Sequence, residues 1–262
     1  MLRALNTAAL GMNAQQRNVD NIANNMANAS TNGYKQTRLV FHDLIYQNIQ
    51  TGGQNEAEGN AAPASLQIGH GAAPVASVRD FRQGGLKQTG NNLDVAINGE
   101  GFLQIRRPDG SIAYTRDGNL NLDAEGNIVT HSGLMLEPDL NVPPEATNIR
   151  ISQDGVVTAE FEGDPVGVEL GQIELARFAN AGGLEPIGGN LFEQTAASGP
   201  PTIATPGQDG MGYVRQGFLE TSNVNIVREM TNLIEAQRAY EINSKMVTTT
   251  EDMLQIANNL KR

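Results

Sequence analysis

Oxygen-bearing side chains recur at every second position between residues 117 and 125, and this run is the strongest candidate for metal binding in the chain. Its members are Asp117, Asn119, Asn121, Asp123 and Glu125. Such spacing is typical of a calcium-binding loop, in which alternate side chains supply oxygen ligands. That loop also needs a glycine where this chain has Leu122 and a closing glutamate where it has Ile128. We therefore predict no metal site here, but a β-strand with Leu120 and Leu122 facing inward.

No other group of residues has the spacing of a catalytic or cofactor site. His42, His70 and His131 share no ligand spacing, so we expect surface or packing roles for them. The glycine-rich residues 207–212 lack a phosphate-binding motif, and the absence of cysteine excludes thiolate chemistry. A glycosidase-type pair among the 29 acidic residues is an open alternative, although nothing singles out a pair. We predict no catalytic residue and no cofactor.

The overall charge argues against nucleic-acid and membrane partners. The 262 residues have a formal net charge of -11, which repels phosphate groups and anionic membrane surfaces. No apolar run approaches the roughly 18 residues of a membrane-spanning helix. Residues 1–16 do not develop the apolar core of a secretory signal. We expect no nucleic-acid binding, no membrane insertion and no cleaved signal peptide.

The composition divides the chain into two ends and a middle. Residues 51–220 contain all 11 Pro, 27 of the 29 Gly and 22 of the 29 acidic residues. Gly and Pro disfavour helix interiors, so the ends are predicted to be helical and the middle to be rich in turns. Such a contrast suggests that residues 1–50 and 221–262 contribute to a unit of their own.

An apolar seam with alternating spacings of three and four runs along the N-terminal end, which is typical of an amphipathic or coiled-coil helix. We predict that the following seam residues form an assembly interface: Leu5, Met12, Val19, Ile22 and Met26. The seam stops in a stretch rich in Asn and Ser, whose side chains satisfy free backbone groups. Because the Asn32-Gly33 pair readily adopts positive φ, the helix is expected to end between Asn28 and Gly33.

A second seam runs through residues 226–260. Its predicted interface residues are Met230, Leu233, Tyr240, Val247 and Leu254. Asn225 is the expected N-cap, and Glu229, one position too late for a capping box, is expected to act on the helix dipole. The helix of residues 226–260 would be about 50 Å long and the N-terminal helix about 40 Å long. They could lie on the middle as surface helices, but their length and narrow seams favour pairing with each other and with other copies.

Short alternating segments separated by turn residues predict strands in the middle. The predicted strands are residues 93–97, 102–105, 112–115, 119–122, 127–130 and 156–158. Pro, Asp and Gly punctuate them at near-hairpin spacing. Residues 50–65 and 195–210 lack apolar periodicity, so we predict mobile or extended connectors there.

These patterns predict an α+β protein whose long N- and C-terminal helices pair as a coiled coil beside an antiparallel β-rich middle domain. The terminal coiled-coil domain would comprise residues 1–33 with 221–262. An extended and β connector domain would comprise residues 34–90 with 181–220. The antiparallel β domain would comprise residues 91–180.

Several segments spread over the whole chain resemble the bacterial flagellar rod and hook proteins. They are residues 23–35, 93–102, 114–118, 217–225 and 236–245. In the first segment the helix-end motif consists of Asn24, Asn25, Asn28, Ser30, Thr31, Asn32 and Gly33. This motif is shared by rod and hook members, whereas the last two segments and the chain length are similar to distal rod members. The chain departs from the family at Met26, where Leu is common.

The resemblance implies a structural subunit of the distal rod with no active site. Such a subunit is exported unfolded through the flagellar export apparatus and polymerises into a hollow helical shaft that transmits torque from motor to hook. Its terminal helices line the tube and its β domain faces outward. Implied partners are further copies, the proximal rod proteins, the hook protein, the peptidoglycan and outer-membrane ring proteins, and the export apparatus. The implied location is the periplasmic rod of the flagellar basal body.

The residues alone leave two other classes open, a secreted β-rich binding module and an acidic hydrolase. Within the family, the alternative is another rod protein or a short hook-type protein. A binding module would keep its function after deletion of both terminal helices, whereas an assembly subunit would lose it. A hydrolase would cleave a glycan in a direct assay and would need a concave site with shifted carboxylate pKa values.

Overall fold

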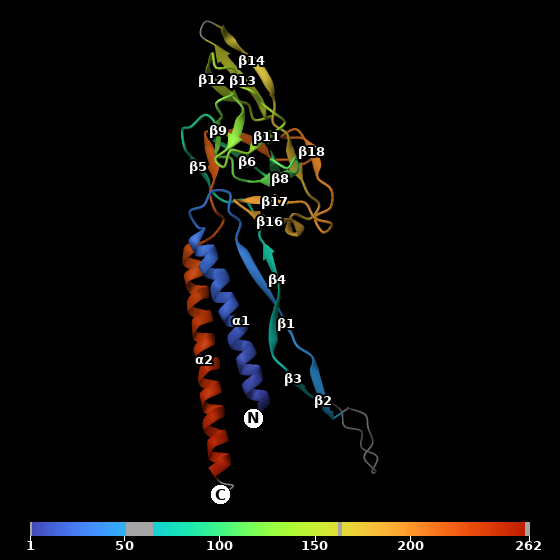
Figure 1. Ribbon diagram of the computed structural model, residues 1–262, viewed down its shortest axis with the longest axis vertical. Helices are drawn as coiled ribbons and strands as arrows, with labels where there is room; N and C mark the ends of the chain where they lie inside the picture. The colour runs from blue at the N-terminus through green and yellow to red at the C-terminus, as the bar shows by residue number, and fades with distance from the viewer. Residues whose placement is uncertain (1, 51–64, 162–163, 260–262) are drawn as a thin grey trace. The chain divides into compact units, whose positions relative to one another are not determined.

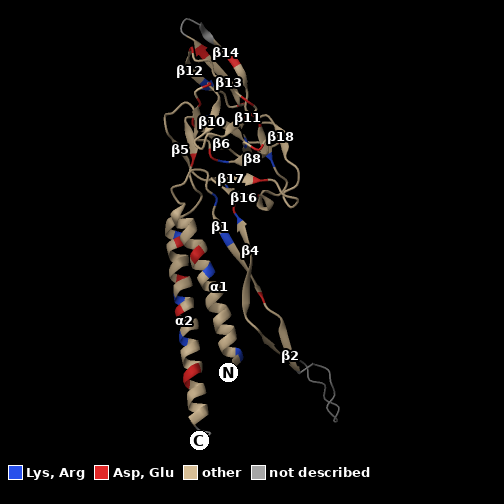
Figure 2. Cartoon of the chain, in the orientation of Figure 1, with Lys and Arg blue, Asp and Glu red and all other residues tan. Residues whose placement is uncertain are grey.

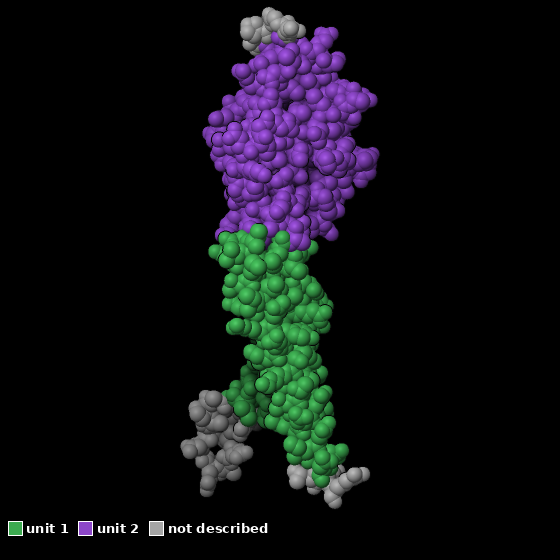
Figure 3. All heavy atoms as spheres, turned by 90° about the vertical axis from the view of Figure 1, so that its left-hand side faces the viewer, with its two compact units in different colours: residues 1–26, 37–78, 225–262 green, residues 27–36, 79–224 purple. Residues whose placement is uncertain are grey.

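The computed structural model of the chain describes residues 2–50, 65–161 and 164–259. Two long helices flank a series of short strands in the sequence, which confirms the predicted α+β class (Figure 1). The chain forms two compact units (Figure 3). Unit 1 comprises residues 1–26, 37–78 and 225–262, and unit 2 comprises residues 27–36 and 79–224. The predicted connector residues 34–90 are divided between the units, and the three-domain division stays a prediction.

Both long helices of unit 1 lie where the absence of Gly and Pro predicts them. Helix α1 spans Leu2–Ala27 and ends directly before the predicted range, after which turns continue to Gly33. Helix α2 spans Ile226–Asn259. The Oδ1 atom of Asn225 accepts a hydrogen bond from the backbone N–H of Arg228 at 3.1 Å, which confirms the predicted N-cap.

Helices α1 and α2 lie side by side within unit 1 (Figure 1). The buried side chain of Asn25 on α1 reaches Glu229 on α2, with 3.3 Å between Nδ2 and Oε2. Further along, a Cβ atom at Gly11 would lie 3.0 Å from Nδ2 of Asn243. The predicted pairing of the two ends is therefore confirmed, and Gly11 allows one of its close approaches.

Two pairs of strands complete unit 1. Strand β1 (Thr37–Asp43) pairs with β4 (Ala72–Arg79), and β2 (Tyr46–Gln50) pairs with β3 (Leu66–Gly69). The segment between β3 and β4 contacts α1 at Gly71, whose Cβ position lies 3.5 Å from Cγ2 of Thr7. Most of the predicted connector 50–65 lies outside the described residues.

Unit 2 consists of short strands, whose pairings are antiparallel. They are β5 (Leu86–Gln88), β6 (Val95–Asn98), β7 (Phe102–Arg106), β8 (Ile112–Thr115), β9 (Leu120–Leu122), β10 (Ile128–Thr130), β11 (Met135–Glu137), β12 (Ala146–Ile151), β13 (Val156–Phe161), β14 (Asp164–Gln172), β15 (Leu175–Arg177), β16 (Glu185–Gly188), β17 (Leu191–Glu193), β18 (Thr202–Ala204), β19 (Tyr213–Gln216) and β20 (Phe218–Glu220). A short 3-10 helix spans Ala181–Gly183.

The largest sheet of unit 2 has the order β16-β17-β8-β7-β11-β10-β9, and β15 joins β18 to β7. A second sheet has the order β12-β13-β14, and two further pairs are β6-β19 and β5-β20. The hairpins β7-β8, β9-β10 and β12-β13 follow the predicted turns. Residues 195–210 are not only a connector, because β18 pairs with β15.

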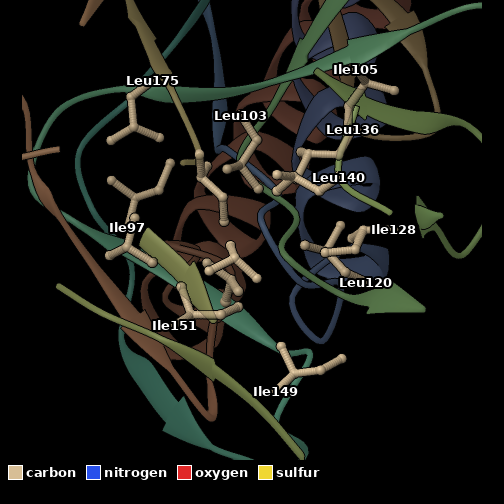
Figure 4. Close-up of a cluster of buried hydrophobic side chains, with 14 of the residues drawn as sticks. Ile97, Leu103, Ile105, Leu120, Ile128, Leu136, Leu140, Ile149, Ile151 and Leu175 are labelled. Atoms are coloured by element: carbon tan, nitrogen blue, oxygen red, sulfur yellow. The ribbon is translucent and has the colours of Figure 1, made fainter. Parts of the chain in front are cut away.

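An aliphatic core holds unit 2 together, with side chains from several strands pointing toward one another (Figure 4). Leu103, Ile105 and Leu175 are fully buried, and each such side chain stabilises the fold by about 1.5–3 kcal/mol. Phe102 belongs instead to an aromatic cluster with Phe192, so β7 is buried on both faces.

The structure confirms only one of the two leucines of β9 that are predicted to face inward. Leu120 is fully buried in the aliphatic core, but Leu122 is 41% exposed. The prediction that Leu122 faces inward is wrong, because the strand ends there and the chain enters the turn at residues 123–126.

Candidate functional site

The five predicted interface residues of α1 are at least half-buried within the single chain. Ile22 is 3% exposed, and Leu5, Met12, Val19 and Met26 are half-buried. Small and polar side chains share this burial, since Ala8, Ala14 and Asn25 are also buried. The apolar seam thus contributes to packing inside unit 1, and its role in assembly stays a prediction.

The predicted interface residues of α2 are less covered. Leu233, Val247 and Leu254 are half-buried, whereas Met230 and Tyr240 are 51% and 42% exposed. Of the described residues of α2, only Glu229 and Ala236 are buried. Hydropathy does not predict the burial of these two residues, because alanine is only weakly apolar and glutamate is charged.

Helix α2 exposes many more large apolar side chains than the predicted seam contains. Those outside the seam are Ile226, Val227, Ile234, Ile242, Met246, Met253 and Ile256. Charged residues of both signs are interspersed along this helix, with no long run of one sign (Figure 2). Exposed apolar surface of this extent marks an interaction site in soluble proteins.

The helix-end motif contributes a buried amide to unit 1. Asn25 is fully buried, and its Nδ2 atom donates to the backbone O of Thr37 at 2.8 Å, while its Oδ1 atom accepts from the Thr37 N–H at 2.9 Å. Nδ2 also reaches Glu229, which receives a further bond from Asn232. Glu229 therefore ties α2 to α1, a contact beyond its predicted effect on the helix dipole. Asn24 of the motif is exposed.

The rest of the motif forms a turn within unit 2. Thr31 Oγ1 donates to Asn28 Oδ1 at 3.2 Å, and the backbone O of Asn32 accepts from Asn190 Nδ2 at 2.9 Å. Gly33 has φ +67°, and a Cβ atom there would lie 2.8 Å from the backbone N of Asp117. Glycine is required by both conformation and space. Ser30 of the motif is exposed.

A buried carboxylate joins four segments of unit 2, and we call this cluster the Glu220 junction. Oε1 of Glu220 lies 2.6 Å from Lys35 Nζ and accepts from the Gly84 N–H at 2.8 Å. Oε2 accepts from Arg116 Nη1 at 3.3 Å. Lys35 also donates to the backbone O of Arg82 at 2.9 Å. The Glu220 junction is defined as Lys35, Gly84, Arg116 and Glu220.

The Glu220 junction buries two cations with one anion. Lys35 and Glu220 side chains are each 1% exposed, and that of Arg116 is 4% exposed. Burial lowers the pKa values of Lys35 and Arg116, because both groups lose solvation of their charged forms, although Glu220 opposes the shift. The backbone O of Glu220 also accepts from the Gly33 N–H at 2.8 Å. Glu220 therefore holds the helix-end turn through its backbone O and the cations through its carboxylate.

No sequence pattern predicts the Glu220 junction. Lys35 and Glu220 lie in two of the segments that resemble rod and hook proteins, but 185 residues separate them. No periodicity connects residues that far apart, so only the three-dimensional structure reveals the contact.

Asp117 begins the run of oxygen-bearing side chains at residues 117–125, for which the sequence predicts no metal site. Burial raises the pKa of its carboxyl group, although hydrogen bonds from Asn119 and Asn190 oppose the shift. The residues that the structure describes contain no cluster of three or more His, Cys, Asp or Glu side chains suited to a metal ion.

We expect Asp117→Asn to alter the pH dependence of unit 2. The pKa of Asp117 is higher in the folded state than in the unfolded chain, so the folded state binds the proton more tightly. The free energy of unfolding should therefore fall as the pH rises from the unfolded-state pKa, about 3.9, through the folded-state pKa. Above the folded-state pKa no further stability should be lost through this group. Asp117→Asn should remove this decline, whereas Asp123→Asn, at an exposed carboxylate, should retain it. Urea unfolding across this pH range measures the difference, and an identical decline in Asp117→Asn would contradict the assignment.

No helix among the described residues is both long enough and apolar enough to span a membrane.

Models of protein families match three segments of the chain. Residues 5–35 match the flagella basal body rod protein, and residues 96–159 match the flagellar hook protein FlgE/F/G D1 domain. Residues 215–260 match the flagellar basal body rod FlgEFG protein C-terminal region. The three charged residues of the Glu220 junction lie one in each matched segment.

Whole relatives align with the chain as well. The flagellar basal-body rod protein FlgG of Borreliella burgdorferi is 49% identical over 264 residues, covering 100% of both chains. The chain belongs to the flagellar basal-body rod protein family. Its resemblance to rod and hook proteins is confirmed, and the family is one of structural proteins that assemble with other components of the flagellar basal body.

Two relatives from one organism distinguish members within the rod protein family. The flagellar basal-body rod protein FlgG of Caulobacter vibrioides is 46% identical over 261 residues, covering 99% of this chain and 100% of the relative. The rod protein FlgF of the same organism is 32% identical over 255 residues, covering 95% and 94%. This rod protein is thus more similar to that organism's FlgG than to its FlgF.

Proposed function

We propose that the chain is a structural subunit of the distal part of the flagellar rod, where copies polymerise into a hollow helical shaft that transmits torque from motor to hook. The observation that carries this proposal is the apolar surface of α2, which the chain itself leaves exposed. Full-length similarity to FlgG proteins, above that to FlgF, supports this member over another rod or hook-type protein. The proposed role is structural rather than enzymatic.

The mechanism we propose couples ordering of the terminal helices to assembly. Met230 and Tyr240 of α2 are about half exposed in one chain, so neighbouring copies would provide their burial. Isolated helices of this kind are only marginally stable in water. Their ordering entropy would be offset by burial at the growing end alone, which confines growth to the tip.

The proposed partners follow from membership in the family. They are further copies of the chain, the proximal rod proteins, the hook protein, the peptidoglycan and outer-membrane ring proteins, and the flagellar export apparatus. The proposed location is the periplasmic section of the basal body. The division into domains of residues 1–33 with 221–262, 34–90 with 181–220 and 91–180 is part of the same proposal.

Leu233→Asp tests the seam. Burying an unpaired carboxylate at a subunit contact should raise the critical concentration for polymerisation by a factor of about 100 or more, because several kcal/mol are lost. Electron microscopy and sedimentation of the purified full chain measure filament formation.

Gln255→Asp is the matched control, since it adds the same charge at an exposed polar position of α2. It should assemble like the wild type, and hydrogen exchange of unit 2 should be unchanged in both variants. Filaments from Leu233→Asp at wild-type concentrations would overturn the seam assignment.

A further inference from the structure

The sequence contains two Asn-Gly pairs, Asn32-Gly33 and Asn98-Gly99. Asparagine is a thermolabile residue, and a following glycine removes the side chain that would shield its amide. The backbone nitrogen of the glycine attacks the side-chain carbonyl carbon, a new C–N bond forms, and the C–NH2 bond breaks with release of ammonia. Water then opens the resulting succinimide to aspartate or isoaspartate. Each pair is therefore a chemically reactive position wherever the chain is unfolded.

The fold of unit 2 holds the first pair in an unreactive arrangement. The attacking nitrogen, that of Gly33, donates its proton to the backbone O of Glu220 at 2.8 Å and is buried. The backbone O of Asn32 accepts a hydrogen bond from Asn190, and Gly33 packs against the backbone at Asp117. Attack would require loss of the Gly33 N–H proton and rotation of this packed turn. Both are blocked while unit 2 is folded.

The second pair is less protected. The Gly99 N–H donates at 3.1 Å to Oε1 of Gln83, and both Gln83 and Asn98 are exposed. A hydrogen bond to an exposed side chain opens more readily than one to a buried backbone carbonyl. The deamidation rates of the two Asn-Gly pairs can therefore be compared within one chain, because the fold shields one pair more than the other.

We propose that Asn32-Gly33 is a spontaneous deamidation site of the unfolded chain, that folding of unit 2 closes it, and that a chain deamidated there cannot complete unit 2. Isoaspartate would insert one additional atom into the main chain directly before Gly33. The Gly33 N–H could then not reach Glu220 while Lys35 keeps its 2.6 Å contact with the same residue. The fraction of chains deamidated at residue 32 would therefore increase with the time that they spend unfolded.

This inference extends the proposed function, because a subunit that waits unfolded before export would accumulate the damage and be excluded from the rod. Its test uses no filaments, so its failure and that of the proposed function are distinguishable.

The first experiment compares the full chain folded in buffer and unfolded in urea, at the same mildly alkaline pH. Peptide mass spectrometry follows conversion of Asn32 and Asn98. In urea both should convert at similar rates. In the folded chain Asn32 should convert at least about tenfold more slowly than in urea, which corresponds to a local opening free energy of only about 1.4 kcal/mol. Asn98 should be slowed less. Equal conversion of Asn32 in both states would overturn the proposal.

The second experiment tests the consequence for folding. Chain aged in urea is refolded and treated with protease, and the resistant fraction of unit 2 is analysed. Molecules deamidated at residue 32 should be depleted from that fraction relative to the unfractionated aged chain. Asn32→Ala should refold in higher yield after ageing than the wild type, and the matched variant Asn98→Ala should still lose the molecules that are deamidated at residue 32. Retention of deamidated residue 32 in the resistant fraction would overturn the second part of the proposal.

Discussion

Glu220→Gln is expected to destabilise unit 2 by about 3–5 kcal/mol, because it leaves the buried charges of Lys35 and Arg116 without their counter-ion. The substitution keeps the size of the side chain, so the effect arises from charge rather than from a cavity. The turn at Gly33 should lose protection together with the rest of unit 2. Hydrogen exchange of the unit 2 amides, combined with urea unfolding of the full chain, measures both quantities.

Glu193→Gln provides the matched control for this substitution. Its carboxylate pairs with Arg107 at 3.0 Å, but it is 45% exposed, so the expected loss is below about 1 kcal/mol. In addition, Lys35→Met should be less harmful in the Glu220→Gln background than in the wild type, because it removes one of the two uncompensated charges. Equal effects of Glu220→Gln and Glu193→Gln would show that the Glu220 junction contributes no special stability.

Gly118→Ala is expected to destabilise unit 2 by about 3 kcal/mol, at the upper end of the range for overpacked positions. A Cβ atom at Gly118 would lie 1.6 Å from the backbone O of Val95. Backbone cannot rotate aside as a side chain can, so β6 would have to separate from the segment before β9. The hydrogen bond from the Val95 N–H to the Gly118 O, 2.9 Å long, would be lost as well.

Gly182→Ala is the control for this change. Its Cβ atom would meet only the side chain of Asn180, at 3.4 Å, and no positive φ is required. Reduced freedom of the unfolded chain should make this variant up to about 1 kcal/mol more stable than the wild type. Thermal unfolding followed by circular dichroism compares the two variants. A Gly118→Ala protein as stable as Gly182→Ala would contradict the close approach at Val95.

Local sequence signals predicted the elements that local physics determines. The ends form α1 and α2 because they lack the residues that interrupt helices, and Asn225 caps α2 as expected. Turn residues predicted the hairpins of unit 2, since Pro, Asp and Gly adopt the turn geometry with little help from the rest of the fold. The strand pairs within residues 37–50 and 65–79 are predicted only as part of an extended and β connector, because few side chains of β1 and β4 are buried and no clear alternation results.

Interactions between distant segments were beyond such signals. β6 and β7 are connected by a short turn, yet β6 pairs with β19, more than a hundred residues later. The Glu220 junction has the same origin, because its carboxylate satisfies partners from three other parts of the chain. Hydropathy alone predicts the seam residues, whereas Ala236 and Glu229 are more deeply buried than Met230. Close helix packing favours small side chains and satisfied polar groups, which a search for apolar periodicity overlooks.

Because Glu220 lies late in the chain, unit 2 can be completed only after its last strands have formed. Strand β20 pairs with β5 and β19 pairs with β6, so two early strands have no partner until the last strands are available. A chain that emerges N-terminus first, from a ribosome or a narrow channel, would expose Lys35 and Gly33 long before residue 220 appears. Contacts of such long sequence separation form slowly. In a partly emerged chain the β5-β20 and β6-β19 pairs and the Glu220 junction therefore stay open, and unit 2 is completed only when nearly the whole subunit has emerged.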